Sequence, residues 1–145
     1  MTDLRSVGIP SPRVESEQKV GGTALYAGDV VLPGMLWVKV LRSPVAHARI
    51  KKIDTSRALA APGVKTIFTG DDFRGARIGK KIIDMPILAE GVVRYIGEKV
   101  AAVAAESETQ AEAALELIDI DYDELPAVLD PLQAISFANG SQASQ

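Results

Sequence analysis

The feature that most restricts the fold is a nearly unbroken apolar run, EKVAAVAAE at residues 98–106, which has the length of one β-strand. A strand with apolar residues on both faces has to be covered on both faces, so the run predicts a strand inside a packed sheet. Its many alanines leave a helix open as the alternative.

The residues after this run predict a helix and then a second kind of strand. Ser107 and Gln110 have the spacing of a capping box, and the apolar residues from Ala111 to Ile118 recur at i, i+3, i+4 and i+7. This pattern predicts an amphipathic helix with one face on the sheet. IDIDYDE at 118–124 then alternates apolar and acidic residues, which is typical of a half-buried strand.

The first two thirds of the chain are less regular. Asp54, Thr55 and Ser56 are natural N-caps for a helical turn over RALAA, which Pro62 and Gly63 end. Residues 70–90 are irregular, basic and glycine-containing, and we expect a long excursion of the binding or interface kind. Further strands are predicted in MLWVKVLRS (35–43), ARIKKID (48–54), VKTIFT (64–69) and VVRYIG (92–97).

Strands and helices without a regular βαβ rhythm predict an α+β fold, with a mixed sheet and packed helices. The length suits one main domain. We expect an extended N-terminal arm at residues 1–18, which contains Pro10, Ser11 and Pro12, a domain at 19–135, and a flexible tail at 136–145.

Composition argues against several classes of function. A net charge of -3 and a pI near 5.2 disfavour nucleic-acid and membrane-surface partners. Without cysteine the chain cannot form disulfides, thiolate zinc sites or cysteine-held iron-sulfur clusters. No stretch approaches the roughly 18 apolar residues that span a bilayer, and the N-terminus does not read as a signal peptide. We therefore expect a soluble, cytoplasmic protein.

The only histidine lies in RSPVAHAR at residues 42–49. Ser43, His47 and an aspartate could form a catalytic triad, but no nucleophile-elbow sequence accompanies them. A lone histidine is also a poor zinc site, because such sites collect three or four ligands. We favour a histidine that fixes a strand end or a subunit contact.

Three other signals have both a functional and a structural interpretation. The basic stretch RGARIGKK at 74–81 can bind an acidic partner surface or a phosphate, although such loops are usually only solvated. Gly21, Gly22 and Gly28 complete no nucleotide-binding motif. Four carboxylates near the end of the domain can be a cation site or the solvated face of a strand, and we favour the solvated face. They are Asp119, Asp121, Asp123 and Glu124.

Four stretches in series carry a resemblance that spans roughly residues 7–135. They are KVGGTALYAGDVVLPGML (19–36), LRSPVAHARIKKIDTSRALAAPGV (41–64), VVRYIGEKVAAVAAES (92–107) and IDIDYDELPAVLD (118–130). In this order they resemble the N-terminal α/β-hammerhead domain of the molybdopterin-binding large subunit in the aldehyde oxidase and xanthine dehydrogenase family. The positions that match the family pattern are Lys19, Gly22, Tyr26, Asp29, Pro33, Gly34, Ser43, Pro44, His47, Ile50, Gly97, Glu98, Val100, Tyr122, Leu125 and Pro126.

The resemblance implies a part in an oxidoreductase that hydroxylates aldehyde or heterocyclic carbons with oxygen from water. In that family the molybdenum cofactor and the catalytic glutamate belong to larger domains after the hammerhead, so we assign this chain no catalytic, cofactor-binding or metal residue and expect it to bind no cofactor alone. The complete complex would hold molybdopterin, iron-sulfur clusters and FAD. The residues expected to serve structure or an interface are Tyr26, Asp29, Ser43, His47, Glu98 and Tyr122.

The expected partners are the molybdopterin-binding catalytic chain or domains, with iron-sulfur and FAD subunits further along the electron path. Two alternatives stay open on the sequence. One is a freestanding assembly or protein-interaction module without a redox role. The other is a small independent enzyme that uses Ser43, His47 and an aspartate.

Overall fold

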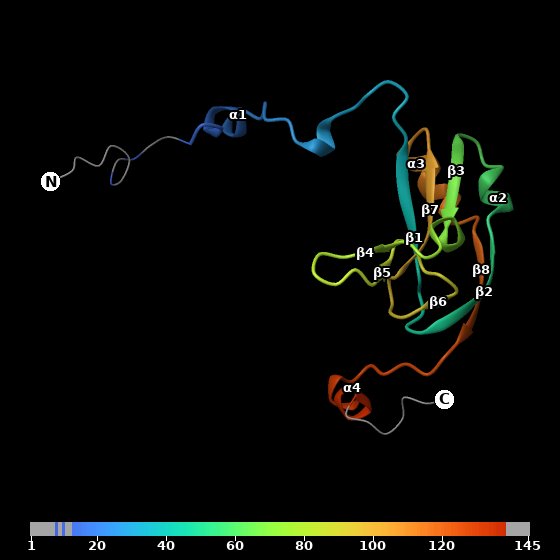
Figure 1. Ribbon diagram of the computed structural model, residues 1–145. Coiled ribbons are helices and arrows are strands. Elements are labelled where there is room, and N and C mark those ends of the chain that lie inside the picture. The colour runs from blue at the N-terminus through green and yellow to red at the C-terminus, as the bar shows by residue number, and fades with distance from the viewer. Residues whose placement is uncertain (1–7, 9, 11–12, 139–145) are drawn as a thin grey trace. The chain divides into compact units, whose positions relative to one another are not determined.

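The structure is a computed structural model that describes residues 8, 10 and 13–138. The chain divides into two compact units, residues 1–35 and residues 36–145 (Figure 1). Within the described part of the chain, no helix is long and apolar enough to cross a membrane.

The first unit is held by contacts between near neighbours in sequence. Its helix α1 (Ser16–Val20) carries an ion pair between Lys19 Nζ and Glu15 at 2.9 Å, and the 3-10 turn η1 (Ala27–Asp29) follows. None of its described residues is buried. The sequence predicted an extended arm over residues 1–18. This prediction is wrong from Ser16 on, where α1 begins. Residues 1–7, 9, 11 and 12 lie outside the described residues.

In the second unit, one sheet places β7 (Lys99–Ala105) between β1 (Trp37–Arg42) and β3 (Val64–Thr69), and both pairings are antiparallel. The apolar run is therefore an internal strand, as predicted, and its helical alternative is wrong. Because both edges and both faces of β7 are covered, Val100 and Val103 are completely buried.

Helix α3 (Glu108–Leu115) follows β7 and packs against this sheet. It begins where the capping pattern predicts, with the Gln110 N–H donating to Ser107 Oγ at 3.3 Å. The short helix α2 (Ser56–Leu59) confirms the predicted helical turn. Together they close the first core cluster, which consists of Ala58, Ala101, Val103, Ala114 and Ile118.

A second sheet has β2 (Ala48–Asp54) between β6 (Val92–Val93) and β8 (Asp119–Glu124), again antiparallel. β8 confirms the predicted alternation, because Ile120 and Tyr122 pack inward while its aspartates face outward. Ile53 and Ile120 contact both core clusters, so the two sheets share one interior. The members of the second cluster are Ala48, Ala89, Val93 and Val100.

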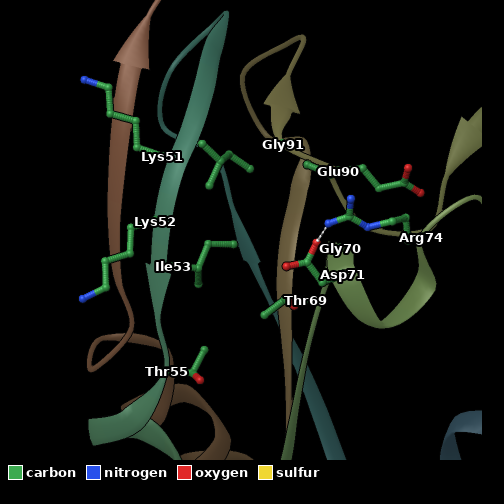
Figure 2. A pocket seen from close by; sticks show the side chains of 12 residues that line it. Lys51, Lys52, Ile53, Thr55, Thr69, Gly70, Asp71, Arg74, Glu90 and Gly91 are labelled. Carbon is green, nitrogen blue, oxygen red and sulfur yellow. Dashed lines mark hydrogen bonds and ion pairs between the residues drawn. The ribbon is translucent and has the colours of Figure 1, made fainter.

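β-Bulges in β2 and β3 shift the alternation of their side chains between the two faces. Ile50 and Ile53 are three residues apart, a spacing that strict alternation places on opposite faces. The pairing of β2 with β8 skips Lys51, and both isoleucines pack in the core as a result. Figure 2 shows Lys51 and Lys52 pointing away from the side that Ile53 faces. β3 skips Lys65 in the same way.

Two segments in the middle of the chain differ from the sequence prediction. The excursion at 70–90 contains the 3-10 turn η2 (Gly70–Phe73) and an unpredicted hairpin of β4 (Arg77–Ile78) and β5 (Met85–Pro86). The strand predicted over 92–97 is only the two residues of β6.

The chain after β8 ends its described part in a helix that was not predicted, α4 (Pro131–Ala138). Asp130 Oδ1 accepts the Leu132 N–H at 2.9 Å, and Pro131 occupies the first helical position, so the start signal was present and overlooked. Three residues of the expected flexible tail, 136–138, are helical, and 139–145 lie outside the described residues. The α+β class is confirmed, with small antiparallel sheets.

Candidate functional site

The connection between β1 and β2 is fastened to the end of the segment that leads into β7. The Ser43 N–H donates to the Glu98 carbonyl, and the Gly97 N–H donates to the Ser43 carbonyl, both at 2.8 Å. Ser43 is 2% exposed, and its Oγ donates to the Val45 carbonyl at 2.9 Å while accepting the Val45 N–H at 3.2 Å. Ser43 therefore shapes a turn, and its hydroxyl is already occupied.

Glu98 is a buried carboxylate, 4% exposed, that closes the turn before β7. One carboxylate oxygen accepts the Arg94 backbone N–H, and the other accepts Arg94 Nη1 at 3.0 Å. Hydrogen bonds to a charged acceptor are stronger than neutral ones, and burial without them would be costly. Glu98 therefore explains why β6 stops after Val93.

His47 joins the same connection to the end of β8. Its Nδ1 lies 2.8 Å from the Pro126 carbonyl oxygen, and the Leu125 N–H donates to the His47 carbonyl at 2.9 Å. Because a carbonyl can only accept, Nδ1 must carry the proton. The bond that holds His47 thus reaches 79 residues along the chain.

Tyr122 lies beneath this connection, in contact with the second core cluster. Its hydroxyl oxygen is buried and has no hydrogen-bond partner of normal geometry among the described residues. Burial raises the pKa of Tyr122, and the nearby Ser43 side chain opposes part of that rise. The Tyr122 hydroxyl is therefore a buried polar group whose burial the Ser43 side chain compensates only in part.

The geometry does not assemble the triad that the sequence left open. The Ser43 hydroxyl is bonded to Val45, and His47 Nδ1, the nitrogen a triad carboxylate would orient, faces a backbone carbonyl.

Tyr26 and Asp29, the other two residues expected to serve structure or an interface, lie in the first unit. There Asp29 Oδ2 accepts the Tyr26 N–H, and the Asp29 N–H donates back to the Tyr26 carbonyl, each at 2.9 Å.

An apolar hollow of about 350 Å³ opens beside His47. Four of its side chains are large, apolar or aromatic, and well exposed: Tyr95 at 49%, Ile96 at 66%, Val128 at 47% and Leu129 at 79%. The hollow was not predicted from the sequence, because its lining comes from three segments that are far apart along the chain, residues 46–47, 94–96 and 127–129. Ala46, His47, Arg94 and Ala127 complete the lining.

A larger hollow, about 550 Å³, lies over β2 and η2 (Figure 2). Its charged groups already have partners within the chain. Arg74 pairs with Asp71, and Glu90 accepts Arg77 Nη1 at 2.6 Å. Arg77 is the largest cause of the lowered pKa of Glu90. This hollow therefore offers a ligand little unsatisfied polarity.

The carboxylates of β8 are spread along an outer face. Asp123 lies 3.7 Å from Lys51 Nζ, and Asp119 lies 3.5 Å from Arg57 Nη1. Across the described residues, no group of three or more histidine or carboxylate side chains is placed to hold a metal ion. The solvated-face interpretation fits this arrangement, since both partners of each pair are well exposed.

Comparison with known proteins gives consistent matches. Residues 21–126 match the family model described as the aldehyde oxidase and xanthine dehydrogenase a/b hammerhead domain. The chain is 45% identical over 124 residues to a probable xanthine dehydrogenase subunit from Bacillus subtilis, covering 85% of this chain and 17% of that protein. It is 37% identical to the nicotine 6-hydroxylase large subunit of Paenarthrobacter nicotinovorans, covering 94% of this chain and 18% of that protein.

Solved structures agree. The Cu,Mo-CO dehydrogenase matches with a TM-score of 0.83 and 39% identity, over 88% of this chain and 16% of that one. Quinoline 2-oxidoreductase from Pseudomonas putida 86 matches with a TM-score of 0.78 and 42% identity, over 85% of this chain and 17% of that one. The chain thus spans about a sixth of the length of these relatives.

Proposed function

Because this chain belongs to the α/β-hammerhead family of aldehyde oxidases and xanthine dehydrogenases, we propose that it is a non-catalytic part of a molybdenum hydroxylase. It packs against the molybdopterin-binding domains, which lie on another chain or in further sequence. Substrate oxidation and electron transfer belong to those domains and to their iron-sulfur and FAD partners.

The observation that carries this proposal is the contrast between the polar and the apolar side chains around His47. The polar groups of Ser43, His47 and Glu98 that have assigned partners bond to this chain itself, which suits a scaffold. The apolar side chains of the neighbouring hollow, by contrast, face outward. A hollow with exposed apolar walls is typical of a surface that another protein covers.

The described residues do not fit a cofactor site of their own. A pterin or phosphate group needs several free hydrogen-bond donors that converge, and the donors around His47 and Glu98 already have acceptors. We therefore derive no chemical step through the molybdenum cofactor on this chain. The cofactor supplies the redox chemistry of the complete enzyme, and this chain supplies shape and support.

The test is complementation in trans. The Bacillus subtilis relative is produced without the stretch that matches this chain, in a truncated form that rebinds its own excised stretch as the positive control. We expect the 145-residue chain to bind the same truncated relative in a one-to-one complex, measured by size-exclusion chromatography and calorimetry.

A matched pair of variants locates the contact. Leu129→Asp, in the hollow, should weaken binding about tenfold or more by placing a charge in an apolar contact. Leu59→Asp, on α2 away from the hollow, should bind as the wild type does. Failure of the wild-type chain to bind, or turnover of an aldehyde by the chain alone, would overturn the proposal.

A further inference from the structure

The β4–β5 hairpin projects from its sheets as a narrow loop (Figure 1). Ile78 pairs with Met85 and Arg77 pairs with Pro86, so only two residues on each side form the stem. A stem of this length is marginal on its own. Its shape therefore depends on contacts at its base and its tip.

Glu90 fastens the base. Its Oε1 accepts Arg77 Nη1 at 2.6 Å and the Gly75 N–H at 3.1 Å, and its Oε2 accepts Arg77 Nη2 at 3.2 Å. This is a two-pronged pairing of a guanidinium with a carboxylate, which fixes direction as well as distance. The Glu90 side chain is only 17% exposed, so the pair is partly shielded from water.

The tip is tightly folded. A Cβ on Gly79 would lie 1.8 Å from the Ile82 carbonyl oxygen, so only glycine allows the backbone to fold back this closely. The tip therefore has a defined shape before it meets any partner, and such preorganisation reduces the entropic cost of binding.

The side chains at the tip are suited to another surface. Ile82 is 71% exposed and Ile83 is 68% exposed, side by side in the sequence. The adjacent Lys80 and Lys81 have no ion-pair partner among residues 13–138. Lys80 and Lys81 precede the two isoleucines and Asp84 follows them, so residues 79–84 carry a net charge of +1. An apolar tip with this charge matches an apolar cleft with a carboxylate rim.

We propose that residues 79–84 are a docking finger that inserts Ile82 and Ile83 into an acid-rimmed apolar cleft on the molybdopterin-binding part of the enzyme. This proposal rests on the proposed function. Two observations support that occupant. Relatives carry more than four fifths of their length beyond the matched stretch, and the finger is basic on a chain whose net charge is -3.

An anionic membrane is the weaker alternative. Recognition of anionic lipid usually takes a cluster of about four to eight basic residues, whereas the tip offers only Lys80 and Lys81. The rigid base also favours insertion into a shaped cleft over adsorption on a fluid surface.

The experiment uses the full 145-residue chain and the same truncated Bacillus subtilis relative. We expect the double variant Ile82→Ser/Ile83→Ser to bind about 10- to 100-fold more weakly than the wild type, because two exposed isoleucines lose their burial in the complex. Leu59→Ser, 53% exposed on α2, is the matched control and should bind normally. Circular dichroism and thermal midpoints should be the same for all three chains.

A second variant tests the charged rim. Lys80→Gln/Lys81→Gln should weaken binding and remove most of its dependence on ionic strength between low and physiological salt. A photo-crosslinker in place of Ile83 should attach to the truncated relative.

The outcomes separate the two proposals. If the wild-type chain fails to bind the truncated relative, the proposed function falls and the docking finger falls with it. If the wild-type chain binds but both double variants bind within about twofold of it, the finger alone is refuted. Binding to phosphatidylserine vesicles that is lost in the lysine variant, with protein binding unchanged, would also refute it.

Discussion

The turn before β7 offers a sharp test of which contact of Glu98 stabilises the fold. Its carboxylate accepts two hydrogen bonds from one residue, from the Arg94 backbone N–H and from the Arg94 guanidinium. The two bonds lie in different surroundings. The carboxylate is 6% exposed, whereas the Arg94 side chain is 49% exposed.

The expected magnitudes follow from this difference. An exposed guanidinium contributes at most about 1 kcal/mol, because water and salt screen it. Leaving a partly buried N–H without its acceptor costs about 1 to 3 kcal/mol. We therefore expect Glu98→Ala to lower the free energy of unfolding by about 2 to 4 kcal/mol and Arg94→Ala, which keeps its backbone N–H, to lower it by about 1 kcal/mol or less.

Urea unfolding of the two single variants and the double variant gives the coupling energy directly. We expect a coupling of about 1 kcal/mol or less, which is the share of the guanidinium. If Arg94→Ala destabilised the chain as much as Glu98→Ala, the side-chain ion pair rather than the backbone bond would hold the turn, and the argument would be wrong.

Three further predictions concern single groups. Gly70→Ala should lower the free energy of unfolding in urea by about 1 to 3 kcal/mol, because its Cβ would lie 2.0 Å from the Ala89 carbonyl oxygen. Gly28→Ala is the control and should change the urea midpoint little, because a Cβ there would have nothing within 4 Å. Tyr122→Phe should leave stability unchanged or raise it by up to about 1 kcal/mol, since it removes a buried hydroxyl without a partner; a clear loss would show that the hydroxyl has one. The pKa of Glu90 is lowered by Arg77, so its contribution to stability is present above the unfolded pKa and is lost as the pH falls through the lower folded value. Acid should therefore lower the protection of the hairpin amides, measured as exchange relative to the intrinsic rate at each pH, and Glu90→Gln should show the lowered protection already at neutral pH.

The last third of the chain could be predicted from local pattern. Ser107 and Gln110 mark the start of α3, and the alternation in β8 assigns its faces, because each signal depends only on neighbouring residues. The internal strand β7 follows from its unbroken apolar run. These elements are local in sequence, so a single sequence contains enough to place them.

Elements that depend on distant partners could not be predicted. The bulge at Lys51 is visible in the sequence only as an irregular spacing of isoleucines, and the register that resolves it belongs to β8, some 70 residues away. The bond between His47 and the Pro126 carbonyl is of the same kind. The hollow beside His47 was missed for the same reason, since its walls meet only in the folded chain.

These long-range contacts also explain why one short connection carries so much of the candidate site. Ser43 ties the end of β1 to the segment that enters β7, and His47 ties the start of β2 to the end of β8. The two sheets are therefore locked together at one end, beside the apolar hollow. A docking surface built on that locked end keeps its shape without a partner. His47 therefore holds one wall of the hollow in place. That hollow is the surface through which we propose that the chain assembles with its partner.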